Sequence, residues 1–182
     1  MFPNANADAV YVWGGTREKG RGTETLCDMW KLDVQTLAWA RVPPKGRTLG
    51  PRSGVSVCTC HAGRYALLCG GVEDIEGGGE RLVGTIDVFD IETDTWLECA
   101  GEGAKIGTRR NAACVSTHGG RKVCLMGGLR EEGKGKQEKE QTLDDAWCAD
   151  VSESGAIGAW RCVVPLSGKG DVWHHDSDDD DD

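Results

Sequence analysis

The chain has little of what membrane-bound or nucleic-acid-binding proteins need. Its 182 residues contain no apolar run near the roughly 18 residues required to cross a bilayer. The formal net charge of -9 offers no basic field for nucleic acid. Residues 1–8 have neither a basic region nor an apolar core, so we expect no secretion signal. These absences argue against membrane and nucleic-acid partners and predict a cytoplasmic protein, with a nuclear address as the alternative.

Glycine, in contrast, is abundant, and glycine pairs recur along the chain at almost equal separations. The pairs are Gly14-Gly15, Gly70-Gly71 and Gly127-Gly128. In two copies an arginine precedes the first glycine of the pair by an identical offset, and a tryptophan precedes that arginine by a second identical offset. These residues are Trp39 and Arg52 in one copy and Trp96 and Arg109 in the next. Fixed offsets across copies indicate an internal repeat, and a period of about 50 residues is typical of propeller blades.

Each copy contains short apolar runs separated by turn residues, which predicts four-stranded antiparallel sheets. The expected fold is all-β, a partial propeller with too few blades to close a ring. Two blades are complete, over residues 51–99 and 109–164, and one, over residues 9–42, lacks its first strand. Residues 1–8 form a lead and residues 165–182 a disordered acidic tail. One sheet has no core of its own, so the tryptophan of each copy is expected to be buried against a neighbour. These tryptophans are Trp39, Trp96 and Trp160.

The nine cysteines are odd in number and do not recur at shared positions in the copies. Several, such as Cys69, Cys114 and Cys124, lie inside apolar runs, where a reduced cysteine acts as a small buried hydrophobe. We therefore expect reduced structural cysteines rather than a disulfide framework. Cys58 and Cys60 with His61 do not complete a tetrahedral metal site.

The motifs of the copies resemble one known family. Gly-Gly, then Asp-x-Trp or Asp-Val-Phe-Asp, then Thr-x-x-Trp and Pro-Arg-Ser-Gly, resembles the kelch repeat of kelch-type β-propellers over residues 9–163. The resemblance implies blades around a central axis, six or seven to a ring, and a protein-binding role in scaffolds or ubiquitin-ligase adaptors. Arg110-Asn111 departs from the Ser-Gly of the preceding copy, and Ala149 stands where Leu32 and Phe89 do.

The chain is too short for such a ring, and three explanations stay open: a fragment of a longer propeller, self-association into a ring, or pairing with another kelch chain.

In an antiparallel meander, the connections after the second and fourth strands emerge at one end. These connections are long and polar here, so we expect this loop face to bind a protein partner. The alternative is that they are solvated spacers, and residues 130–140 are candidates for disorder. The candidate binding residues are Arg17, Arg47, Arg52, Glu73, Asp74, Glu76, Arg81, Arg109 and Arg130.

Little in the sequence supports catalysis. Galactose oxidase shares the propeller type, but its family's copper site needs tyrosine and histidine ligands. The only tyrosines, Tyr11 and Tyr65, lie within predicted strands. His174-His175-Asp176 stands in the acidic tail, where a specific metal site is not expected. We therefore expect a non-catalytic interaction module with no catalytic residues, cofactor or metal. A galactose-oxidase-like enzyme fragment and a truncated, non-functional fragment are the alternatives.

Overall fold

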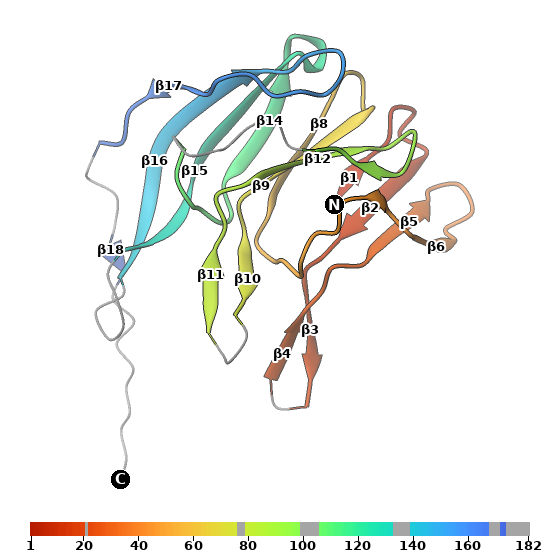
Figure 1. The fold of residues 1–182 in the computed structure, drawn as a ribbon, viewed down its shortest axis with the longest axis horizontal. Coiled ribbons are helices and arrows are strands. Elements are labelled where there is room, and N and C mark those ends of the chain that lie inside the picture. Colours follow the sequence, from red (N-terminus) through yellow and green to blue (C-terminus); the bar gives the residue numbers. More distant parts are fainter. Residues whose placement is uncertain (21, 76–78, 99–105, 133–138, 168–171, 174–182) are drawn as a thin grey trace.

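Three antiparallel sheets stand side by side in chain order, like successive blades (Figure 1). The computed structural model describes residues 1–20, 22–75, 79–98, 106–132, 139–167 and 172–173. The first sheet has the order β1 (Phe2–Pro3), β2 (Ala9–Trp13), β5 (Met29–Asp33) and β6 (Trp39–Val42). The second has the order β7 (Lys45–Gly46), β13 (Thr95–Trp96), β12 (Ile86–Asp90), β9 (Tyr65–Cys69) and β8 (Ser56–Cys60). The third contains β14 (Ala113–Thr117), β15 (Lys122–Glu132), β16 (Lys139–Asp150) and β17 (Arg161–Val164), and β18 (Val172–Trp173) also pairs with β16.

Smaller elements complete the fold. Two hairpins, β3 (Thr16–Lys19) with β4 (Gly22–Thr25) and β10 (Val72–Asp74) with β11 (Glu80–Leu82), follow the second strands of the first two sheets. A 3₁₀ turn, η2 (His118–Gly120), joins β14 to β15. The four-strand blade predicted for each complete copy is confirmed, and the second sheet adds the short parallel strand β7 at its edge.

The first sheet is more complete than the sequence indicated. The prediction that it lacks its first strand is wrong, because Phe2 pairs with Tyr11 and Pro3 with Val10. Phe2 is buried, and its ring stacks on Tyr11 with 5.6 Å between centroids. It also meets the edge of Phe89 in the second sheet. A two-residue strand shows no alternation of apolar and polar residues, so its burial was not visible in the sequence.

Part of the acidic tail is also ordered. Val172 and Trp173 pair with Gln141 and Glu140 in β16, so the prediction of a disordered tail from residue 165 is wrong for this segment. The backbone N–H of Ser167 donates to the Asp144 carboxylate at 2.9 Å. The six aspartates near the end of the chain, with His174-His175, lie outside the described residues.

Each interface between neighbouring sheets holds one apolar cluster. The first cluster includes Tyr11 and Trp13 from the first sheet, and Phe89 and Trp96 from the second. The second joins the second and third sheets through residues that include Leu67, Ile86, Val123, Leu125 and Trp160. Strand β9 serves both clusters, since Ala66 and Leu68 face the first sheet and Tyr65, Leu67 and Cys69 face the third. Burial on both faces explains why its sequence is apolar throughout instead of alternating.

The repeat tryptophans show which neighbour each sheet packs against. Trp96 is 3% exposed, and its ring lies 5.5 Å from that of Trp13 in the preceding sheet. Trp160 is likewise buried in the cluster with the second sheet. Burial of these two is confirmed. The prediction is wrong for Trp39, which is 55% exposed. Trp96 and Trp160 each pack against the preceding sheet, whereas the first sheet has no predecessor in the described part of the chain.

The glycine pairs make the backbone contacts between successive copies. Gly14, Gly70 and Gly127 all have positive φ, at +64°, +65° and +61°. The N–H of Gly15 donates to the Arg52 carbonyl, and that of Gly71 donates to the Arg109 carbonyl, each at 2.9 Å. A Cβ on Gly70 would collide with the Arg109 carbonyl oxygen. The pair therefore supplies both the left-handed turn and the space through which the next copy's chain passes.

Substitutions at two glycines with the same φ distinguish the cost of the left-handed conformation from the cost of a steric clash. Gly20, at the tip of the first hairpin, also has φ +65°, but a Cβ there meets nothing within 4 Å. We expect Gly20→Ala to lower the free energy of unfolding by about 1 kcal/mol, the cost of a left-handed non-glycine residue. Gly70→Ala adds the clash with the Arg109 carbonyl, so its cost should exceed about 2 kcal/mol. Urea denaturation of both variants measures the difference, and equal costs would contradict a close approach at Gly70.

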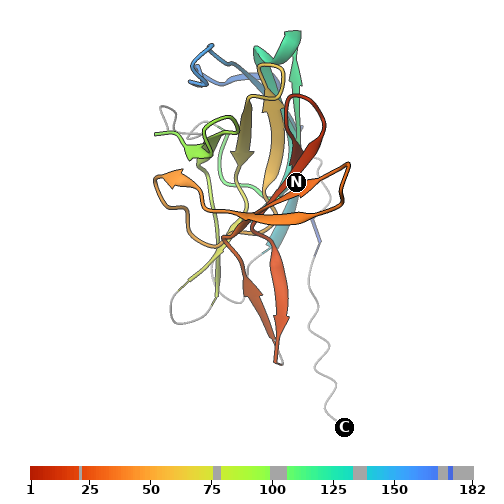
Figure 2. The same ribbon diagram turned by 90° about the vertical axis from the view of Figure 1, so that its right-hand side faces the viewer.

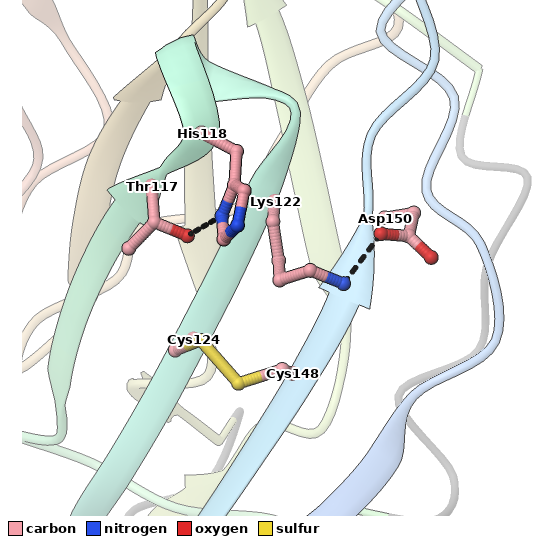
Figure 3. The surroundings of a disulfide bond; sticks show 6 residues. All are labelled: Thr117, His118, Lys122, Cys124, Cys148 and Asp150. Carbon is pink, nitrogen blue, oxygen red and sulfur yellow. Dashed lines mark hydrogen bonds and ion pairs between the residues drawn. A yellow bond between two sulfur atoms is a disulfide. The ribbon is translucent and has the colours of Figure 1, made fainter.

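The cysteines depart from the prediction in one place. Cys124 and Cys148 form a disulfide across β15 and β16 (Figure 3), so the expectation of reduced cysteines throughout is wrong. The two residues are direct partners in the antiparallel register, with their Cα atoms 4.2 Å apart. The sequence does not show register, so this juxtaposition could not be predicted. Cys58 and Cys114, on neighbouring sheets, are free thiols whose sulfurs lie 3.1 Å apart.

Candidate functional site

The connection after the second strand of each sheet extends into a projecting β-ribbon. The first two are the β3–β4 and β10–β11 hairpins, and the third is formed by the distal parts of β15 and β16, where Gly128–Glu132 pairs with Lys139–Leu143. All three project from the same side of the sheets in Figure 1, and Figure 2 shows the first two hairpins projecting on that side. We call this surface the hairpin face. The residues described within 130–140 are therefore paired strand rather than disordered chain.

The first hairpin carries exposed, opposite charges in cross-strand contact. The Arg17 guanidinium lies 2.6 Å from the Glu24 carboxylate, and the Lys19 ammonium lies 3.0 Å from its other oxygen. Hydrogen bonds from Lys19 and Arg17 lower the pKa of Glu24 below its usual value. Exposed pairs of this kind add little stability and remain available to other charged groups. Of the predicted binding residues, Arg17 therefore lies on the hairpin face with its charge accessible.

Four of the predicted residues meet in one network at the base of the second hairpin. Arg52 donates to Asp87 at 2.7 Å and to Glu73 at 2.9 Å, and Arg81 donates to Glu73 at 2.8 Å. Arg47 also pairs with Asp87. Burial acts to raise the pKa of Glu73, but hydrogen bonds from Arg81 and Arg52 outweigh it and lower the pKa.

The network is layered from the interior to the surface. Asp87 and Arg52 are buried, Glu73 is half-buried, and Arg81 is exposed. Arg52 also lies near the Trp13 ring, with its guanidinium carbon 5.9 Å from the ring centroid. The prediction of Arg52 as a partner-contacting residue is therefore wrong. It anchors the hairpin from beneath, while Arg81 presents the accessible charge.

Arg109 has the equivalent role in the third sheet. It donates to both oxygens of Asp145, at 2.7 and 2.9 Å, and to the carbonyls of Gly127 and Ile106. Arg109 is 3% exposed and Asp145 is buried. A side chain so placed does not reach a partner, so its prediction as a binding residue is also wrong. Arg52 and Arg109 are the repeat arginines. Each lies just before the first strand of its sheet and pairs with an aspartate of the same sheet, so it fixes the incoming segment to that sheet.

Two of the remaining predicted residues, Arg130 and Asp74, lie in the ribbons of the hairpin face. Arg130, on β15, donates to Gln141 on β16 at 2.9 Å. Asp74 is exposed at the end of β10. Glu76 lies outside the described residues. Sequence reasoning missed Asp87 and Asp145, the acidic partners of the repeat arginines. The signal was present, because each stands two residues before an aromatic side chain, as Asp28 does before Trp30.

The tyrosines needed for a copper-radical site lie in the core. Tyr11 and Tyr65 are both buried, and the Tyr65 hydroxyl donates to the Glu153 carbonyl at 3.1 Å. Among the residues that the structure describes, His, Cys, Asp and Glu side chains do not gather in any group of three or more suited to hold a metal ion. Nor does the described part of the chain contain a helix long and apolar enough to span a membrane.

Stacked four-stranded antiparallel sheets, joined by a glycine-pair and arginine junction that recurs at a nearly constant spacing, define the class of β-propeller blades. A family model described as the KLHDC2/KLHL20/DRC7 Kelch-repeats domain matches residues 3–169. The chain belongs to this kelch-repeat family.

A solved structure titled "Structure of YjhT" supports the fold. The similarity has a TM-score of 0.64 at 20% sequence identity and covers 90% of this chain. It covers 50% of the YjhT chain, so this chain spans about half the length of that structure.

Proposed function

We propose that this chain is a non-catalytic protein-binding module that holds its partner on the hairpin face. The observation that carries the proposal is the common projection of three β-ribbons from one side of a stacked sheet scaffold. Kelch-repeat membership supports a protein-interaction role in general. Loops and ribbons on a rigid scaffold are where binding residues concentrate, because they vary in sequence without disturbing the core.

The charges on the hairpin face indicate what kind of partner surface fits. The hairpins present Arg17, Lys19 and Arg81, each paired with a glutamate of the opposite strand. A partner that offers carboxylates at matching positions can exchange with these glutamates, and an arginine fork binds a carboxylate in two-point fashion. We therefore favour a folded protein or extended peptide with an acidic contact surface. The location of this chain itself, in the cytoplasm or the nucleus, stays a prediction.

Charge reversal on the hairpin face tests this function. The partner would be isolated from a soluble extract by cross-linking to the immobilised chain, identified by mass spectrometry and purified for titration. We expect the double variant Arg17→Glu with Lys19→Glu, and separately Arg81→Glu, to weaken its binding at least tenfold, about 1.4 kcal/mol. Arg121→Glu makes the same chemical change at an exposed residue of the β14–β15 turn, at the other end of the sheet, and is the control.

Circular dichroism and urea denaturation would establish that each variant is folded. The proposal fails if both hairpin variants bind the purified partner as the parent chain does. Weakening confined to Arg121→Glu would place the binding surface at the opposite end of the sheets.

A further inference from the structure

The stack of sheets ends in an exposed apolar surface at each side. On the first sheet, Trp30, Leu37 and Trp39 are large exposed apolar residues, and we call this surface the leading flank. On the third sheet the corresponding exposed residues are Val115, Met126, Val163 and Val164, which form the trailing flank. Several large apolar residues exposed on one side of a sheet are typical of an interaction surface. The question is what covers them.

The two internal joints of the chain show what each flank is built to contact. Every other residue of a second strand faces the following sheet, so Tyr11 and Trp13 of β2 face the second sheet, and Leu67 and Cys69 of β9 face the third. The tryptophan of the following copy, Trp96 or Trp160, then packs into the same cluster as this row. A joint therefore consists of a second-strand row on one sheet and a repeat tryptophan on the next.

The exposed flanks carry one half of this joint each. In the third copy, the positions equivalent to Leu67 and Cys69 are Cys124 and Met126, the outward row of β15. Met126 is 40% exposed, and Cys124 is fixed by its disulfide to Cys148 on the same sheet (Figure 3). Trp39, the tryptophan half, is exposed on the opposite flank. The chain thus presents both complementary halves of its own internal joint, on surfaces that face away from each other.

The geometry points to a second copy of this chain as the occupant of both flanks. We propose that two copies associate head to tail, with Trp39 of each packed on the Cys124 and Met126 row of the other. The two joints are then equivalent and are related by a two-fold axis, so the dimer is closed and its interface is isologous. The three large sheets of the described residues, taken from two copies, make six. The likeness to YjhT fits this count, because the fold match that takes up 90% of this chain occupies 50% of that one.

Light scattering coupled to size-exclusion chromatography tests the proposal. We expect the parent chain to elute as a single species near twice its 19.5 kDa mass. Trp39→Glu and Met126→Glu each place a charge in both joints of the assembly, so each variant should self-associate at least tenfold more weakly. Ile75→Glu is the control, because Ile75 is also a large exposed apolar residue but lies beyond β10, away from both flanks.

Mixing the two flank variants gives a further readout. The Trp39→Glu copy keeps an intact trailing flank and the Met126→Glu copy an intact leading flank, so the mixture should regain one of the two joints and form a heterodimer. A parent chain that is monomeric through the micromolar range would overturn the proposal. So would a dimer that survives both flank substitutions, or a distribution of larger open assemblies. Charge reversal at Arg17 and Lys19 should leave the mass unchanged, which separates this interface from partner binding on the hairpin face.

Discussion

Arg109→Ala is expected to lower the free energy of unfolding by about 3–5 kcal/mol, the usual cost of breaking a buried ion pair on one side. Arg109 is almost completely buried and donates to both carboxylate oxygens of Asp145. It also donates to the carbonyls of Gly127 and Ile106. Truncation leaves an uncompensated buried carboxylate and two carbonyl groups that lose a donor. Urea denaturation at neutral pH measures the loss.

An exposed ion pair of the same sheet is the control. Lys122 lies 2.6 Å from Asp150, and both side chains are accessible to water. Lys122→Ala should therefore cost less than about 1 kcal/mol. Equal losses for the two variants would show that the Arg109–Asp145 pair contributes no more than a surface contact.

The pH dependence distinguishes a lost ion pair from general damage to packing. Burial acts to raise the pKa of Asp145, but hydrogen bonds from Arg109 and Trp147 outweigh it and hold the pKa below its usual value. The stability from this shift is present above the pKa of the unfolded chain and is lost as the pH falls through the folded value. Without Arg109, the effect of burial remains and the pKa of Asp145 should rise. Protonation of Asp145 then removes the unpaired buried charge and reduces the loss of stability in the variant. The stability difference between parent and variant should therefore narrow in acid.

The repeat arginines also show where sequence reasoning succeeded and where it failed. Their fixed offset from the glycine pairs correctly indicated a repeated structural element. Their charge suggested a surface position, since arginine is seldom fully buried unless it is paired. The paired aspartates, Asp87 and Asp145, follow their arginines at almost the same spacing in both copies. That spacing was readable, but only the strand register shows that the aspartate lies beneath the arginine.

Local pattern predicted the fold well, because every sheet repeats the same glycine turns and strand order. Features that depend on a contact with a neighbouring strand or sheet could not be predicted from the sequence. The Cys124–Cys148 disulfide requires the register of β15 and β16, and β1 requires the ring of Phe2 to reach Phe89 in another sheet. For the candidate site, the connections after the second strands extend as ribbons from one side of the sheets (Figure 1), and the binding role of this face stays a prediction. The sequence did not show that Thr16–Lys19 and Val72–Asp74 are strands of hairpins, since charged cross-strand pairs do not produce an apolar alternation.

Trp96→Ala is expected to lower the free energy of unfolding by about 3–5 kcal/mol, as for other large aromatic residues in a core. The Trp96 ring lies 5.0 Å from Phe89 and 5.5 Å from Trp13, so its removal opens a cavity across the joint between two sheets. Trp39 occupies the same position in the preceding copy but is exposed. In dilute solution, where the chain is monomeric, Trp39→Ala should change the stability by less than about 1 kcal/mol.

Protein concentration then separates the two tryptophans. The cost of Trp96→Ala arises within one chain, so thermal unfolding should show the same loss at every concentration. If a second copy covers the leading flank, the parent chain becomes more stable as its concentration rises, because association favours the folded state by mass action. Trp39→Ala should reduce that increase while leaving the dilute-solution stability in place. A loss of several kcal/mol from Trp39→Ala in dilute monomer would instead mean that this ring packs within its own chain, contrary to its exposed position.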